Sequence, residues 1–149
     1  MHLIIVVCLV TGLVFLPGSA AWAQNGGEQE LMELLVKSYD LLEADKLAEA
    51  KKAYEEILTR FPDNPLALNN LGALYVREND YKQALTYLER ALAKAKGYKV
   101  WVDRQCDVNK ICLAFRPGAR EYATHDLEPL IAANLDMVKA KAAEGKEGK

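Results

Sequence analysis

Apolar residues recur at spacings of three and four from Leu31 onward, which is the period of an amphipathic helix. This pattern continues, with three interruptions, as far as Gly97. It predicts four helices, over residues 31–42, 47–60, 65–77 and 81–96.

Residues that start and stop helices stand at the interruptions. Asn64-Pro65 predicts the start of the third helix, because asparagine caps a helix and proline fits its first turn. Asp80 is the expected cap of the fourth helix, and Gly97 its expected end.

After Gly97 the pattern changes to β-branched and aromatic residues. Residues 99–102 and 111–115 are expected to form a hairpin around a turn at 107–110, with Cys106 and Cys112 opposite each other. From Leu127 to about Lys141 the helical spacing returns, and Pro129 is tolerated in the first turn of this last helix. The charged residues 143–149 predict a disordered tail.

The first 23 residues contain no Lys, Arg, Asp or Glu, and residues 3–16 are almost wholly apolar. Ala21-Trp22-Ala23 places small residues where a signal peptidase requires them. We therefore expect a periplasmic or secreted protein that is cleaved after Ala23, with a flexible lead-in over residues 24–30. An uncleaved anchor is the alternative, although a spanning helix needs about 20 apolar residues.

The charged residues are interspersed: 19 Lys and Arg stand against 21 Asp and Glu, for a net charge of −2. There is no basic stripe that predicts nucleic-acid binding. There is also no cationic amphipathic helix that predicts membrane association once the signal peptide has been removed.

The predicted helices repeat with a period of 34 residues. Under this shift Leu34 matches Leu68, and Ala50 matches Ala84. A helix-turn-helix unit of this length is typical of tetratricopeptide repeats. Residues 31–98 resemble two such repeats, at 31–64 and 65–98. The second repeat carries more of the family pattern, at Leu71, Gly72, Tyr75, Tyr81, Ala84 and Ala91.

The resemblance implies two helical repeats. Together with the residue pattern after Gly97, it predicts a mainly α fold with a disulfide-closed β-hairpin over residues 99–118 and a linker with a capping helix over 119–142. Leu34, Leu41, Leu71 and Tyr75 would fill the space between helices, and Gly72 would let two helices approach closely. The resemblance also implies a concave groove, lined by the first helix of each repeat, that binds a protein or peptide partner. The expected groove residues are Met32, Leu35, Tyr39, Asn69, Asn70, Ala73 and Arg77.

Within this groove, Asn70 matches an asparagine with which carboxylate-clamp members of the family hold a peptide's main chain or its terminal carboxylate. Leu35 stands where those members have a basic residue, so the clamp is incomplete. The alternative to a separate ligand is self-association, which would cover Met32, Leu35 and Leu42 in a homo-oligomer.

Candidate catalytic chemistry is sparse after residue 23, where Ser38 and His125 are the single serine and histidine. No phosphate loop, nucleophile elbow or metal-ligand spacing is present, which predicts a protein without catalytic residues, metal or cofactor. Cys106 and Cys112 predict a structural disulfide. A thiol–disulfide redox role is the alternative, but it favours a two-residue spacing at a helix start.

Overall fold

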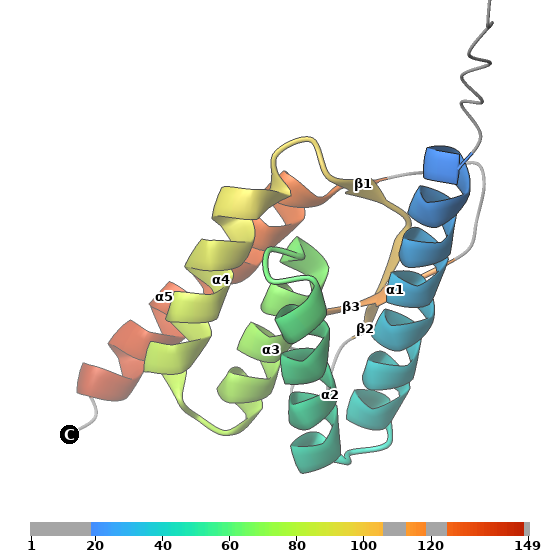
Figure 1. Ribbon diagram of the computed structural model, residues 1–149. Coiled ribbons are helices and arrows are strands. Elements are labelled where there is room, and N and C mark those ends of the chain that lie inside the picture. The colour runs from blue at the N-terminus through green and yellow to red at the C-terminus, as the bar shows by residue number, and fades with distance from the viewer. Residues whose placement is uncertain (1–18, 106–112, 119–124, 148–149) are drawn as a thin grey trace, which may run out of the picture.

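The computed structural model describes residues 19–105, 113–118 and 125–147 (Figure 1). In these ranges the chain forms five helices and four short strands. In chain order they are α1 (Ser19–Glu43), α2 (Leu47–Arg60), α3 (Pro65–Arg77), α4 (Tyr81–Ala95), β1 (Lys99–Val100), β2 (Val102–Gln105), β3 (Ala114–Pro117), β4 (His125–Asp126) and α5 (Leu127–Glu147).

Each of the first four helices packs against the next one along the chain, and α5 packs against α4 (Figure 1). The mainly helical, repeat-like architecture agrees with the prediction, and α5 covers the end of the helix stack. Because each hairpin buries its apolar side against its neighbour, the core runs through all five helices.

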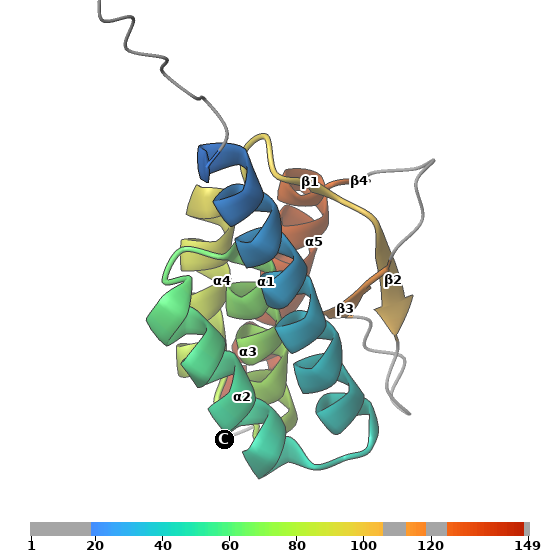
Figure 2. The same cartoon turned by 45° about the vertical axis from the view of Figure 1, so that its right-hand side comes forward.

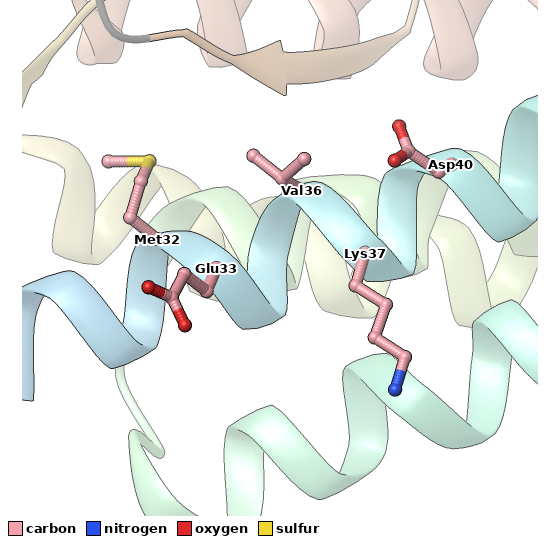
Figure 3. A pocket seen from close by; sticks show the side chains of 5 residues that line it. All are labelled: Met32, Glu33, Val36, Lys37 and Asp40. Carbon is pink, nitrogen blue, oxygen red and sulfur yellow. The ribbon is translucent and has the colours of Figure 1, made fainter.

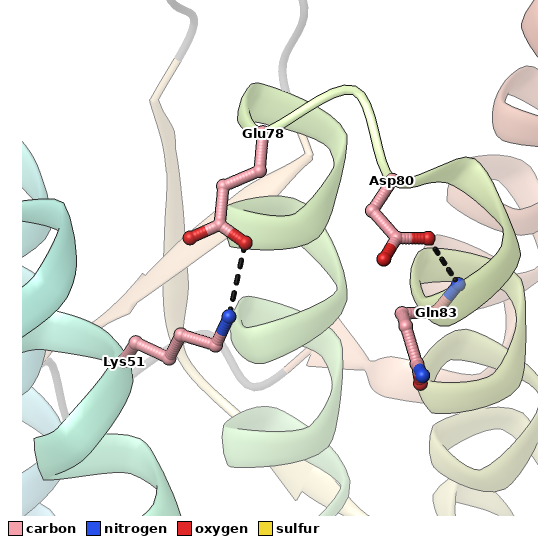
Figure 4. A network of polar contacts seen from close by, with 4 residues as sticks. All are labelled: Lys51, Glu78, Asp80 and Gln83. Atoms are coloured by element: carbon pink, nitrogen blue, oxygen red, sulfur yellow. Dashed lines mark hydrogen bonds and ion pairs between the residues drawn. The ribbon is translucent and has the colours of Figure 1, made fainter.

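The predicted helix caps are confirmed. The Asn64 side-chain oxygen accepts a hydrogen bond from the Ala67 N–H at 2.9 Å, and Pro65 is the first residue of α3. The Asp80 carboxylate accepts one from the Gln83 N–H at 3.0 Å, which starts α4 (Figure 4). These bonds satisfy main-chain donors that have no partner inside the helix.

Gly72 lies where α3 crosses α4. A Cβ atom at this position would lie 3.0 Å from Leu88 Cγ and 3.3 Å from the Ala84 carbonyl oxygen. The glycine therefore permits the close approach that the sequence predicts. On the neighbouring side, Lys51 of α2 forms an ion pair with Glu78, just after α3, at 2.9 Å (Figure 4).

The β region pairs differently from the prediction. β2 and β3 form the antiparallel hairpin, with Val102 opposite Pro117 and Gln105 opposite Ala114, whereas β1 pairs with β4. Trp101 separates the two pairings. Its carbonyl accepts the Gly118 N–H at 3.0 Å, and its ring fills the space in which a Gly118 side chain would stand. Residues 99–102 thus contribute to two small sheets.

The helical ends extend beyond the predicted ones. α1 begins at Ser19 and includes residues 24–30, which were expected to be a flexible lead-in. Gln29 donates a hydrogen bond to Glu33 one turn on, and Glu30 forms an ion pair with Arg60 of α2. α5 continues to Glu147, through most of the expected tail. None of the helices in the described ranges combines the length and the apolar character needed to cross a membrane.

The predicted disulfide lies outside the described residues, since Cys106 and Cys112 fall between residues 105 and 113.

Candidate functional site

The surface formed by α1, α3 and α5 holds an extended segment of the same chain. β3 packs against α1 and α3, and β2 lies on its outer side (Figures 1 and 2). The sequence predicts a groove on the first helices of the two repeats, and these helices are α1 and α3. In this structure, its occupant is the inserted hairpin.

Asn70 of α3 holds the main chain of β3 at Phe115. The Asn70 side-chain oxygen accepts a hydrogen bond from the Phe115 N–H at 2.9 Å, and its amide nitrogen donates to the Phe115 carbonyl at 2.8 Å. One side chain therefore satisfies both main-chain groups of one residue, as a neighbouring β-strand would. This form of recognition is independent of the side chain that the extended segment carries.

Two further amides hold the segment at Leu113. Asn69 of α3 and Asn134 of α5 each donate a hydrogen bond to the Leu113 carbonyl, both at 2.8 Å. The three asparagines are also linked: Asn134 donates to Asn69 at 2.9 Å, and Asn69 donates to Asn70 at 3.1 Å. All three side chains are fully buried. We call Asn69, Asn70 and Asn134 the asparagine triad.

Tyr54 of α2 also contacts the asparagine triad. Its hydroxyl accepts a hydrogen bond from the Asn70 amide nitrogen at 3.0 Å. Burial raises the pKa of the Tyr54 hydroxyl above the usual value for tyrosine, and the hydrogen bond from Asn70 offsets only part of this rise. The hydroxyl is therefore neutral throughout the physiological pH range.

The side chains of β3 add contacts to those of its main chain. Phe115 is fully buried in the core, and Leu113, directly before β3, is only 2% exposed. Arg116 reaches α1, where its guanidinium forms an ion pair with Asp40 at 3.1 Å. The segment is thus held by an aromatic anchor, a cation and the asparagine triad.

Five of the seven predicted groove residues are buried and are not accessible to a partner in this conformation. They are Leu35, Tyr39, Asn69, Asn70 and Ala73, none more than 6% exposed. The groove prediction places Tyr39 and Asn70 on an accessible surface, whereas both are buried. Asn70 is hydrogen-bonded to the main chain of β3. Conversely, Leu34 and Leu41, expected to be buried between helices, are only partly buried.

Arg77 has a local role in the described structure. Its guanidinium donates to the Leu42 carbonyl at 3.3 Å and lies 3.6 Å from the Asp45 carboxylate. It therefore bridges the end of α3 to the turn between α1 and α2.

Met32 lies at a surface pocket of about 310 Å³ on α1. The pocket is lined by Met32, Glu33, Val36, Lys37 and Asp40. Figure 3 shows Met32, Val36 and Asp40 on one side of the helix, with Glu33 and Lys37 on the adjacent side. Met32 is therefore a predicted binding residue that lines an open surface feature.

Asn134 is the functional residue that the sequence prediction missed. It stands on the apolar stripe of α5, three residues after Ile131 and four before Val138. Since a buried amide needs hydrogen-bond partners, an asparagine in this position is itself a signal of a buried polar contact. The signal does not reveal that the partners are a hairpin carbonyl and an asparagine of α3.

Among the residues that the structure describes, no cluster of His, Cys, Asp and Glu could hold a metal ion.

Comparisons with known proteins give one match. The family model described as tetratricopeptide repeat matches residues 41–101, which span most of the first predicted repeat and all of the second. Neither the curated proteins nor the solved structures that were compared yielded a match. The helix-turn-helix period, the small residues where α3 crosses α4 and this match agree that residues 41–101 belong to the tetratricopeptide repeat family.

Proposed function

We propose that the chain is an exported, non-catalytic protein-interaction module, which binds an extended segment of a partner protein between α1, α3 and α5 in exchange for β3. Tetratricopeptide repeats generally mediate protein–protein interaction and are typically non-catalytic. The observation that carries the proposal is the pair of hydrogen bonds from Asn70 to the main chain of Phe115. Because these bonds recognise main chain, a partner segment in the same conformation satisfies them equally well.

Two sequence features support export and a disulfide. The apolar segment before Ala23 has the layout of a signal peptide. Gln105 and Ala114 are paired across the hairpin, and Cys106 and Cys112 lie close to them in the sequence. In an oxidising compartment such a pair closes a disulfide, which would restrict the hairpin in its free state and when it occupies the groove.

Exchange makes a distinctive prediction, because β3 and the partner compete for one site. When β3 occupies the site, the apparent affinity for a partner equals the intrinsic affinity multiplied by the fraction of protein whose groove is open. Asn70→Ala weakens both occupants alike and should change partner binding little. Phe115→Ala weakens β3 alone and should increase partner binding. In the Phe115→Ala background the groove is no longer occupied by β3, so adding Asn70→Ala should strongly reduce partner binding.

The experiment is affinity capture from a periplasmic extract with four full-length proteins: the wild type, the two single variants and the double variant. Glu89→Ala, on the exposed face of α4, is the matched control. The proposal predicts most capture with Phe115→Ala, and a loss on adding Asn70→Ala to it. If Phe115→Ala is folded and captures no more than the wild type, the groove is not the partner site.

A second candidate site is the α1 pocket around Met32 and Val36. A partner that docks there leaves β3 in place, so Phe115→Ala would not change its binding. Met32→Glu, by contrast, would abolish it by placing a charge on the apolar lining. Self-assembly without a separate ligand is the remaining alternative. Sedimentation of the purified protein tests it, since a monomer at micromolar concentration excludes it.

A further inference from the structure

The segment in the groove shows which partner sequence the groove favours. β3 satisfies the asparagine triad with main chain, but two of its side chains make contacts that depend on residue type. Phe115 is fully buried, and the adjacent Arg116 pairs with Asp40 of α1 at 3.1 Å. The groove thus offers an aromatic position next to an acidic position.

We propose that the partner segment carries an aromatic residue followed directly by a basic residue, and that it takes the places of Phe115 and Arg116. This inference rests on the proposed function, in which a partner replaces β3. The aromatic residue is the main determinant, because its side chain fills a space enclosed by core residues. The basic residue contributes less, since Arg116 and Asp40 are 37% and 53% exposed and solvent screens their attraction.

Neighbouring positions add a weaker preference for a compact apolar segment. Leu113 and Ala114 are buried before the aromatic position, and Pro117 is buried after the basic one. Proline at this place lacks an N–H, so the segment needs no donor partner there. A partner with a charged residue at the position of Leu113 would have to bury that charge beside the asparagine triad, which is unfavourable.

The test uses a fluorescently labelled peptide that spans residues 111–118, with Cys112→Ser, and the full-length Phe115→Ala protein. Removal of the Phe115 ring weakens the internal occupant and leaves a space that an aromatic side chain can fill. Fluorescence anisotropy should show the peptide binding this variant at least about tenfold more tightly than the wild type. The peptide should also raise the thermal midpoint of the variant.

Peptide variants test the two determinants separately. Phe115→Ala in the peptide should weaken binding by at least about tenfold. Arg116→Glu in the peptide should weaken it by about threefold to fivefold at low salt. Adding Asp40→Arg to the protein should reverse this last preference, so that the Glu-containing peptide binds more tightly. A charge swap of this kind would not arise from non-specific adhesion.

The outcomes separate this inference from the proposed function. If a peptide of the same composition in scrambled order binds as tightly as the native one, the sequence preference is overturned while exchange at the groove stands. If no peptide binds a folded Phe115→Ala protein, exchange itself is overturned. Circular dichroism establishes that the variant is folded. If the Phe115→Ala protein is unfolded, the Arg116→Glu protein is used in its place. This surface change weakens the contact of β3 with α1 without opening the core. The peptide should then bind about threefold more tightly than it binds the wild type.

Discussion

Asn70 forms hydrogen bonds with four polar groups through one side chain: the Phe115 N–H, the Phe115 carbonyl, the Tyr54 hydroxyl and the Asn69 amide nitrogen. Its replacement leaves buried groups without partners, and each such group costs about 1–3 kcal/mol. We therefore expect Asn70→Ala to lower the free energy of unfolding by about 3 kcal/mol, and Glu89→Ala to change it by less than about 0.5 kcal/mol. Urea unfolding of both variants measures the difference. Equal stability of the two would mean that Asn70 does not hold β3.

Tyr54 makes the free energy of unfolding depend on pH in the alkaline range. Burial raises the pKa of its hydroxyl in the folded state, whereas an unfolded tyrosine titrates near a pKa of about 10. The unfolded chain thus loses this proton at a lower pH than the folded one. The resulting stabilisation is complete below about pH 10 and is lost progressively as the pH rises above it. Burial likewise raises the pKa of Tyr98, partly offset by the hydrogen bond from Asn64, which adds to the effect.

Urea midpoints at pH 8 and pH 11 test this dependence. The wild type should lose stability between the two, and Tyr54→Phe should lose less because phenylalanine does not titrate. An equal loss in both proteins would show that Tyr54 is not the group that senses alkaline pH.

At the scale of the helix, the two capped starts provide a matched comparison. Asn64 caps α3 while 7% exposed, and its amide nitrogen also donates to the Tyr98 hydroxyl at 3.1 Å. Asp80 caps α4 at an exposed position. Asp80→Ala should cost about 1 kcal/mol, and Asn64→Ala about 2 kcal/mol, because the second also removes the bond to Tyr98. Thermal or urea unfolding of the two variants ranks them, and the opposite order would contradict the assigned role of Asn64.

The crossing of α3 and α4 depends on the missing side chain at Gly72. Alanine is the better helix former by about 1 kcal/mol, which alone would stabilise the protein. Its Cβ would, however, lie 3.0 Å from Leu88 Cγ and 3.3 Å from the main-chain oxygen of Ala84. We expect the steric crowding to outweigh the gain in helix propensity, so that Gly72→Ala destabilises the fold by about 1 kcal/mol. A rise in the urea midpoint would show that α4 can move away at little cost.

The elements with strong local signals were predictable from sequence, and those set by distant contacts were not. Asn64 and Asp80 mark helix starts through bonds to residues three positions on, and Gly97 follows the end of α4 with a positive φ, so the local sequence places them. The position of β3 depends on contacts with Asn69, Asn70 and Asn134, 21 to 45 residues away. No local pattern encodes such a contact.

The burial of the predicted groove residues was not predictable for a related reason. The resemblance to tetratricopeptide repeats predicts the groove and places Asn70 in it. The resemblance covers residues 31–98, however, and so it does not include the hairpin of β2 and β3. An amide that is expected to hold a ligand's main chain does hold an extended main chain, which belongs to the protein itself.

At the scale of the whole molecule, export determines where the mature chain begins. If the signal peptide is removed, the native protein starts at Gln24, a position that lies within α1. Amino-terminal sequencing of the protein from its native source decides this. An intact segment through Ala23 in the membrane fraction would indicate an anchored protein instead.

A disulfide between Cys106 and Cys112 is expected in the same compartment. Closing so short a loop should stabilise the fold by about 2 kcal/mol. Intact-mass measurement with and without reductant, after alkylation, detects the bond, and Cys106→Ser with Cys112→Ser measures its contribution. Two free thiols that alkylate readily in the native protein would favour the redox alternative.

Amide hydrogen exchange at Phe115 in the free, full-length protein is the most direct test of the central claim that the groove is occupied by β3. This N–H is bonded to a fully buried asparagine, so its exchange should be slow, comparable to amides in the middle of α3. Partner binding by exchange should then accelerate it while the α3 amides stay protected. If the Phe115 amide of the free protein exchanges as rapidly as an exposed loop, β3 does not fill the groove and the account fails.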